Sequence, residues 1–248
     1  MGHPLDPYLR LEKIPTVFCS GCGCGTTANI FLHAVKELGY KSLRGFVFVS
    51  GIGCSSWIPS PHFKADTIHT LHGRAIPVAT GIALTRPDLK VVVFGGDGDL
   101  GSIGLNHLVH AARRNVNILT IMVNNLVYAM TGGQSSPTTP KWLTGIVSFK
   151  SSIRESTLDI CRLVADAGAS YVARWSVLHV NSLKNSFKKA LEMKGFRFIE
   201  VVAQCTSRIS ERLKLTPLQY LKMLARYMKP INDIKEGELD IIPIGEYI

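Results

Sequence analysis

A glycine-rich turn with two carboxylates, Gly95-Gly96-Asp97-Gly98-Asp99-Leu100, is the first stretch of this sequence whose residue types could do chemistry. It follows the apolar run 91–94 and precedes a segment with helical periodicity. Glycines at a helix start let backbone N–H groups approach a phosphate, and neighbouring carboxylates can hold its cation. The same pattern also occurs in a plain Asp-Gly turn, so a second group of ligands is needed.

A second polar strand end supplies that group. The apolar run 117–123 ends in Asn124-Asn125-Leu126-Val127-Tyr128. Neighbouring parallel strands end at the same edge of a doubly wound sheet, where ligands bind, so we expect Asp97 and Asn125 to converge. A carboxylate and an amide oxygen, with room for phosphate oxygens, suit Mg²⁺ better than zinc or iron. The two strand ends together predict a metal-diphosphate site.

The cysteines form the other reactive group. The chain has six of them, Cys19, Cys22, Cys24, Cys54, Cys161 and Cys205. We expect four to assemble into one site: Cys19 and Cys22 from one loop, and Cys54 and Cys205 from two strand ends. This set is open to a four-thiolate zinc or a [4Fe–4S] cluster, and the Cys-x-x-Cys spacing also fits a thioredoxin-like redox pair. Cys161, inside an apolar helical segment, is expected to be core packing.

Strands and helices alternate along the chain and must position these residues. The expected strands are 46–50, 91–94, 117–123, 171–173 and 196–203, and the expected helices are 26–38, 75–85, 103–114, 157–167, 179–193 and 217–228. This order predicts an α/β fold with a doubly wound, mostly parallel sheet and helices on both faces. We divide the chain into an N-terminal arm (1–18), a cofactor domain (19–205) and a C-terminal helix and tail (206–248).

Three further segments have predicted roles. Thr26 and Thr27 are expected to cap the first helix. The loop 128–140 is poor in apolar residues and long enough to cover a ligand. In the arm, prolines discourage helix, and four apolar side chains are expected to dock: Leu9, Leu11, Ile14 and Val17.

Composition limits the class of protein. Hydrophobic residues make up 46% of the 248 residues, as in a globular protein, and the apolar runs are shorter than the about 20 residues that a membrane-spanning helix needs. The N-terminus lacks a secretory signal pattern, so we expect a cytoplasmic protein that is not bound to a membrane. The net charge of +10 is scattered, which argues against nucleic acid as a partner and leaves an acidic protein as one.

The motifs taken together resemble one family. They are Cys-x-x-Cys-Gly at 19–23, Gly-Ile-Gly-Cys-Ser-Ser at 51–56, His-x-x-His-Gly-Arg-Ala at 69–75, Gly-Asp-Gly-Asp at 96–99, Asn-Asn-x-Val-Tyr-x-Met-Thr-Gly-Gly-Gln at 124–134, and the late Cys205. In this order they are similar to the β subunit of 2-oxoacid:ferredoxin oxidoreductases. The resemblance covers the chain to about residue 205 and implies the thiamine diphosphate-binding fold.

The resemblance also implies roles for individual residues. Asp97 and Asn125 look like side-chain Mg²⁺ ligands and Val127 like a backbone carbonyl ligand. The [4Fe–4S] ligands look like Cys19, Cys22, Cys54 and Cys205. The implied cofactor contacts are Ile52, Gly53, Cys54, Ser55, His72, Gly73, Gly96, Asp97, Gly98, Asp99, Asn125, Val127, Tyr128 and Thr131. Of these, His72 and Asp99 are the implied catalytic residues.

The implied reaction is the coenzyme A-dependent oxidative decarboxylation of a 2-oxo acid, with electrons passing to ferredoxin. The glutamate that activates thiamine diphosphate in such enzymes lies on a pyrimidine-binding domain. This chain has no second α/β module, so an α subunit must supply that domain, and the chain alone should be inactive.

Two alternatives and two departures from the family pattern remain open. A non-oxidative thiamine diphosphate decarboxylase subunit needs no thiols, and a zinc-stabilised accessory subunit needs no cofactor. Cys24 stands where many members have His, and we expect it to fill space. Trp57 follows Cys-Ser-Ser where several members have a basic residue for a distal substrate carboxylate, which leaves Arg74 or Lys141 for that role and the identity of the 2-oxo acid open.

Overall fold

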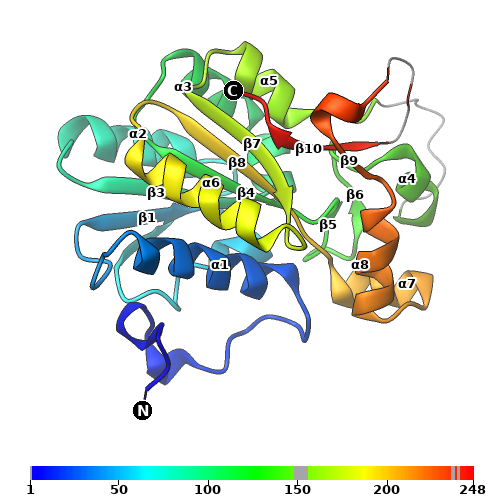
Figure 1. Ribbon diagram of the computed structural model, residues 1–248, viewed down its shortest axis with the longest axis horizontal. Helices are drawn as coiled ribbons and strands as arrows, with labels where there is room; N and C mark the ends of the chain where they lie inside the picture. Colours follow the sequence, from blue (N-terminus) through cyan, green and yellow to red (C-terminus); the bar gives the residue numbers. More distant parts are fainter. Residues whose placement is uncertain (1, 148–155, 236–237, 239–240) are drawn as a thin grey trace.

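An eight-stranded sheet organises the protein (Figure 1). The computed structural model describes residues 2–147, 156–235, 238 and 241–248. The strand order is β2-β1-β3-β4-β8-β7-β10-β9, and only the β7–β10 pair is antiparallel among these described strands. Their bounds are β1 Phe46–Ser50, β2 Asp66–His69, β3 Lys90–Gly96, β4 Leu119–Asn124, β7 Tyr171–Ser176, β8 Arg197–Val202, β9 Met228–Pro230 and β10 Ile242–Glu246.

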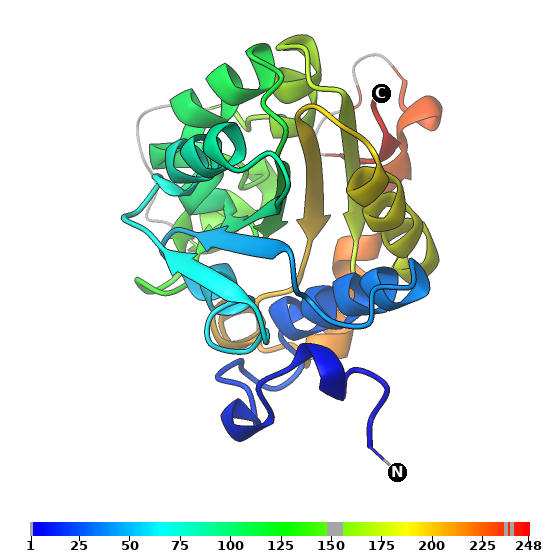
Figure 2. The same cartoon turned by 90° about the vertical axis from the view of Figure 1, so that its left-hand side faces the viewer.

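Helices cover both faces of the sheet, which confirms the predicted doubly wound α/β fold (Figure 2). The longer helices are α1 Gly23–Glu37, α2 Ala75–Thr85, α3 Leu105–Arg113, α5 Ile160–Asp166, α6 Val180–Glu192 and α8 Pro217–Ala225, and the shorter ones are α4 Lys141–Val147 and α7 Glu211–Leu213. Helices α1 and α6 pack on one face through Phe31 and Phe187, whereas α2, α3 and α5 pack on the other. Strands β1, β4 and β8 are therefore buried at every residue.

The first helix begins earlier than predicted, at Gly23, with Cys22 preceding it. Thr27 does not cap this helix, because its hydroxyl donates to the carbonyl of Gly23 within the helix. The helix start lies against the end of β8, where a Cβ at Gly23 would be 2.4 Å from the Cβ of Ala203. Helix and cysteine loop are thus held directly at the carboxyl edge of the sheet.

The prediction for the N-terminal arm was wrong in detail. Leu11, Ile14 and Val17 are exposed, and among the four expected side chains only Leu9 packs against the core. Two short 3-10 turns, Asp6–Tyr8 and Leu11–Lys13, redirect the side chains. Docking comes instead from buried Leu5 and from Tyr8, whose hydroxyl donates to the carbonyl of Tyr40 at 2.6 Å.

Three further segments differ from expectation. The predicted helix 103–114 is α3 preceded by a separate π-helical turn, Asp99–Ile103, that ends at Gly104. At this interruption Gly104 lies so close to Gly73 that a Cβ on Gly104 would be 3.1 Å from the Cα of Gly73. The predicted cover loop contains the hairpin β5 Val127–Tyr128 and β6 Gln134–Ser135, and the tail adds β10 to the sheet.

The helix expected over 217–228 ends at Ala225, since Met228 begins β9. The helix expected over 157–167 is the shorter α5, and the side chain of Asp159 caps it by accepting from the Arg162 N–H at 3.1 Å. Within the described part of the chain, no helix is both long and apolar enough to cross a membrane.

Candidate functional site

Loops after β1, β3 and β4 meet at the carboxyl edge of the sheet around a cavity of about 120 Å³, which we call the carboxylate cavity. Every cofactor contact implied by the sequence lines it except Gly73. Its lining residues are Cys24, Ile52, Gly53, Cys54, Ser55, His72, Gly96, Asp97, Gly98, Asp99, Val123, Asn125, Val127, Tyr128, Ala129, Met130 and Thr131. The predicted convergence of Asp97 and Asn125 is therefore present.

Asp97 is almost fully buried at the start of the helical turn after β3. Burial raises the pKa of its carboxyl to about 6, while hydrogen bonds from Ser136 and Thr138 oppose the rise. The Ser136 hydroxyl donates to Oδ2, and the Thr138 hydroxyl lies 3.2 Å from the same oxygen. A buried carboxylate with only neutral partners is costly as an anion, so a cation beside it would compensate for the burial.

Asp99 has a different role, because it ties three loops together. Its Oδ1 accepts from His72 Nδ1 at 2.6 Å, from the Gly73 N–H at 2.7 Å and from the Ile52 N–H at 3.2 Å. Its side chain is fully buried, whereas that of His72 is 43% exposed. Asp99 therefore fixes the positions of His72 and of the loop at Ile52 beside the cavity.

Two buried oxygens of the carboxylate cavity have no hydrogen-bond partner within the described residues, Asp99 Oδ2 and the hydroxyl of Ser55. Glycines keep the surrounding backbone close. A Cβ at Gly51 would lie 2.1 Å from Asp99 Oδ2, and one at Gly98 would lie 2.5 Å from the ring of Tyr128. The unpaired hydroxyl of Ser55, beside the lining residue Gly96, fits a polar ligand that supplies the missing partner, whereas Asp99 Oδ2 faces Gly51.

The turn after β4 presents Asn125 and Val127. The Asn125 side-chain oxygen accepts from the Val127 N–H at 3.2 Å, which closes the turn. Between them, Leu126 has φ 68°, a left-handed conformation that is uncommon for Leu. Tyr128 continues from this turn and donates its hydroxyl to Ser102 at 2.7 Å.

The predicted thiols line a second cavity of about 230 Å³, which we call the thiol cavity. All six cysteines of the chain are free thiols, and five line this cavity: Cys19, Cys22, Cys24, Cys54 and Cys205. Burial, together with the neighbouring thiols of Cys22, Cys205 and Cys19, raises the pKa of Cys54 to about 11. A hydrogen bond from Cys24 lowers the pKa of Cys22 to about 7. The four predicted ligands are thus close enough to influence one another.

Their arrangement is not a closed metal site. Across residues 2–147, 156–235, 238 and 241–248, no group of three or more His, Cys, Asp or Glu side chains is placed to hold a metal ion. Cys24 is buried between the two cavities, consistent with its expected packing role. Cys161 lies elsewhere in the core, as predicted, with its thiol 3.3 Å from Glu200.

The two cavities share a wall. Six residues line both of them, Cys24, Cys54, Val123, Asn125, Ala129 and Met130. Among these, Asn125 was predicted as a Mg²⁺ ligand and Cys54 as a cluster ligand. A group bound by the carboxylate cavity and a group bound by the thiols would therefore be immediate neighbours.

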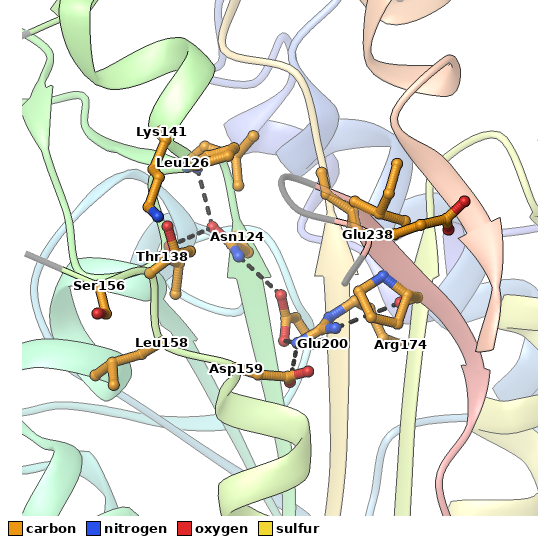
Figure 3. A pocket seen from close by; sticks show the side chains of 15 residues that line it. Asn124, Leu126, Thr138, Lys141, Ser156, Leu158, Asp159, Arg174, Glu200 and Glu238 are labelled. Carbon is orange, nitrogen blue, oxygen red and sulfur yellow. Dashed lines mark hydrogen bonds and ion pairs between the residues drawn. The ribbon is translucent and has the colours of Figure 1, made fainter. Parts of the chain in front are cut away.

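Sequence reasoning missed a third cavity of about 290 Å³, lined in part by Arg174, Glu200, Asp159 and Lys141 (Figure 3). Arg174 and Glu200, charged residues inside the largely apolar strands β7 and β8, were the sequence signal that could have indicated this cavity. Lys141 lies here and not at the carboxylate cavity, so of the two basic residues that the sequence offered for a distal carboxylate, Arg74, beside His72, is the one near the predicted cofactor loops.

Comparisons with known proteins agree with this arrangement. Residues 51–201 match the family described as thiamine pyrophosphate enzyme, C-terminal TPP binding domain. The 2-oxoglutarate synthase subunit KorB of Methanocaldococcus jannaschii is 45% identical over 99% of this chain and 92% of its own length. The 2-oxoacid:ferredoxin oxidoreductase subunit beta of Saccharolobus solfataricus is 42% identical over 76% of this chain and 61% of its own length.

A solved structure is also similar along the whole chain. It is 2-oxoglutarate:ferredoxin oxidoreductase from Magnetococcus marinus with 2-oxoglutarate, coenzyme A and succinyl-CoA bound, and it has a TM-score of 0.83 and 32% identity over 99% of this chain and 84% of that one. The sequence resemblance is thereby confirmed. This chain belongs to the thiamine pyrophosphate enzymes and, among them, to the β subunits of 2-oxoacid:ferredoxin oxidoreductases.

Proposed function

We propose that this β subunit binds thiamine diphosphate with Mg²⁺ in the carboxylate cavity and a [4Fe–4S] cluster in the thiol cavity. Its reaction would be the oxidative decarboxylation of a 2-oxo acid, yielding CO₂ and an acyl-coenzyme A, with two electrons leaving one at a time to ferredoxin. The observation that carries the proposal is the shared wall, since a cofactor that releases electrons needs an acceptor close by.

The oxygen ligands for Mg²⁺ would be the Asp97 carboxylate, the Asn125 amide oxygen and the Val127 carbonyl. These are hard oxygen donors, which Mg²⁺ prefers and completes with phosphate oxygens and water. The unpaired hydroxyl of Ser55 would donate to the bound cofactor, and Asp99 would hold His72 beside it. Bound thiamine diphosphate supplies the carbon nucleophile for the 2-oxo carbon, and the protein orients and shields that reaction.

The thiol ligands would be Cys19, Cys22, Cys54 and Cys205. Thiolates are soft donors that suit iron-sulfur clusters, and four of them surround one cavity here. Cys24 would stay outside the ligand set because it is almost fully buried and its pKa is raised well above the ordinary value, first by its hydrogen bond to Cys22. A cluster held there would lie beside the shared wall, in reach of electrons from the carboxylate cavity.

An α subunit would complete the site. Exposed apolar side chains line the carboxylate cavity or lie beside its loops: Ile52 and Met130 line it, Leu71 precedes His72, and Ile103 lies against Gly73. Leu71 is 78% exposed, which is unusual for a side chain beside a buried cofactor site unless another surface covers it. The α subunit would contribute the pyrimidine-binding domain and its activating glutamate.

The relatives' names favour 2-oxoglutarate as the 2-oxo acid. Trp57 does not offer a charge for its distal carboxylate and instead lies edge-on to His69 with ring centres 6.2 Å apart. Arg74 is the alternative offered by the sequence, since it follows His72 and donates to that residue's carbonyl at 3.3 Å. Coenzyme A and an acidic ferredoxin would be the other partners, the latter matching the +10 charge.

One experiment tests the proposal and its two rivals. The chain is produced with its α subunit and purified without oxygen, and its iron, sulfide and zinc contents, visible spectrum and bound thiamine diphosphate are measured. We expect a broad thiolate-to-iron absorption band and 2-oxoglutarate-dependent reduction of ferredoxin. Stoichiometric zinc in a colourless protein would favour the accessory subunit, and cofactor without iron would favour the non-oxidative decarboxylase.

A further inference from the structure

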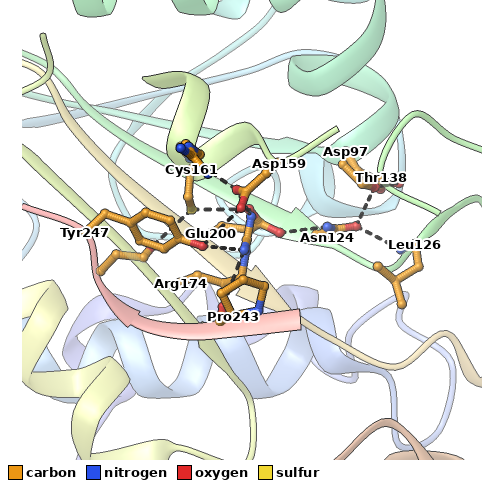
Figure 4. Close-up of polar contacts among 12 residues, drawn as sticks. Asp97, Asn124, Leu126, Thr138, Asp159, Cys161, Arg174, Glu200, Pro243 and Tyr247 are labelled. Carbon is orange, nitrogen blue, oxygen red and sulfur yellow. Dashed lines mark hydrogen bonds and ion pairs between the residues drawn. The ribbon is translucent and has the colours of Figure 1, made fainter. Parts of the chain in front are cut away.

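We propose that Glu200 and Asn124 are positioning residues that hold the turn carrying Asn125 and Val127 in its metal-binding shape (Figure 4). The inference rests on the proposed function, in which this turn binds Mg²⁺. Neither residue is a ligand in that proposal, and both lie in a buried hydrogen-bonded chain that begins at Asp97 and ends at Arg174.

The turn needs support because its central residue is strained. Leu126 has φ 68° and a buried side chain, so it adopts a left-handed conformation that Leu rarely takes. Two side chains hold its peptide groups: Asn124 Oδ1 accepts from the Leu126 N–H at 2.9 Å, and the Thr139 hydroxyl donates to the Leu126 carbonyl at 2.6 Å. Without them the backbone would relax and carry Asn125 and Val127 with it.

The orientation of the Asn124 amide decides whether this support exists. Its oxygen must face Leu126, so its NH₂ group must face the other way. That group donates to Glu200 Oε1 at 2.7 Å, and a carboxylate can only accept. Glu200 therefore selects the amide orientation that supports the turn, and a residue able to donate at this position would not.

Glu200 is itself fixed from the opposite side. Its Oε2 forms a buried ion pair with Arg174 at 3.0 Å, and Arg174 also donates to Asp159 at 2.6 Å and to the hydroxyl of Tyr247 at 2.5 Å. These partners come from β7, the start of α5 and the segment after β10. The ion pair thus connects the turn after β4, through Glu200 on β8, to Arg174 on β7.

The chain also connects the two sides of the metal site. The Thr138 hydroxyl lies 2.9 Å from Asn124 Oδ1 and 3.2 Å from Asp97 Oδ2, with one proton for the two acceptors. Asp97 and the turn are consequently placed by the same set of contacts. Outer partners of this kind orient metal ligands and change metal affinity when they are lost.

The test uses the assembled αβ enzyme and measures Mg²⁺ affinity at saturating thiamine diphosphate by titration calorimetry. We expect Glu200→Gln to weaken Mg²⁺ binding about tenfold, the usual scale for an outer partner of a metal ligand. The matched control is Cys161→Ala, which removes the thiol 3.3 Å from the other oxygen of Glu200 and should leave Mg²⁺ affinity unchanged. If the ion pair had only a structural role, Glu200→Gln would lower the melting temperature without changing Mg²⁺ affinity, and the inference would be overturned.

A second variant covers the case in which Glu200→Gln does not assemble. Asn124→Ser removes the amide while leaving the Glu200–Arg174 pair in place, and it should also weaken Mg²⁺ binding at least tenfold. Mg²⁺ affinity equal to that of the wild type in the folded variant would overturn the inference. Asp97→Ala distinguishes failure of the inference from failure of the proposed function. If Asp97→Ala also binds Mg²⁺ normally, the proposed metal site itself is wrong. If only Asp97→Ala loses Mg²⁺ binding, the metal site stands and the positioning role is wrong.

Discussion

The carboxylate cavity and the thiol cavity lie at the same edge of the sheet and share a wall, yet they are built differently. Both carboxylates of the first cavity are already held, Asp97 by two hydroxyls and Asp99 by three N–H groups. The thiols are placed mainly by backbone contacts, such as the Cys22 N–H to the Cys19 carbonyl at 3.0 Å. We infer that the oxygen site is already shaped for the proposed ligands, whereas the thiol site would need a bound metal to close.

The strongest test of this comparison removes a proposed metal ligand from the carboxylate cavity. Asp97→Ala should lower Mg²⁺-dependent binding of thiamine diphosphate in the assembled complex by at least about 100-fold, since it deletes a charged inner ligand. Iron content should stay unchanged because no thiol is touched. Titration calorimetry with Asp88→Ala, a surface carboxylate paired only with Arg86 in the described structure, provides the control.

The reciprocal test acts on the thiol side. Cys205→Ser should abolish the iron-dependent absorption band and most of the bound iron while thiamine diphosphate still binds. The expected loss is large because the change deletes one of the four proposed thiolate ligands. Cys161→Ser, in the core away from both cavities, is the control for cysteine replacement. Unchanged iron in Cys205→Ser would mean that Cys24 or a ligand outside this chain completes the set.

The sequence predicted the positions of these sites better than their shapes. Apolar runs located β1, β3, β4 and β8, and the rule that parallel strands end together brought Asp97, Asn125, Cys54 and Cys205 to one edge. The polar residue that follows a buried strand was the informative signal. Strand ends are fixed by the sheet, so they can be predicted without knowledge of the loops.

Contacts between distant backbones could not be predicted in this way. The π-helical turn after β3 ends at Gly104, which lies against Gly73, and no local periodicity indicates that contact. The support of Leu126 by Asn124 and Glu200 was also missed. These two residues are 76 positions apart, and nothing in the sequence around either one indicates that they form a hydrogen bond. The exposure of Leu11, Ile14 and Val17 depends in the same way on where the arm turns.

A smaller effect is expected from weakening the hydrogen bonds that shape the carboxylate cavity without removing a proposed ligand. Asp99→Asn keeps the size of the side chain but places a donor among the N–H groups of Ile52, Gly73 and the ring of His72. We expect thiamine diphosphate affinity to fall about tenfold, because a buried acceptor of several hydrogen bonds is weakened. Iron content should not change. An equal loss of iron would show that the two cavities form one cooperative unit and are not separately organised.

The smallest expected effect concerns how much the buried Asp97 carboxylate destabilises the ligand-free protein. Burial raises the Asp97 pKa from its ordinary 3.8 to about 6, so the folded chain holds this proton more tightly than the unfolded chain does. Stability from this group is therefore greatest at low pH and is lost as the pH rises toward and through 6. Asp97→Asn removes that dependence, so its stability relative to the wild type should increase by about 1 kcal/mol between pH 5 and pH 7. Denaturant unfolding of the ligand-free β chain at the two pH values measures the difference. A pH-independent difference would mean that Asp97 does not bear this cost, and that the carboxylate cavity, like the thiol cavity, takes its final form only with its ligand.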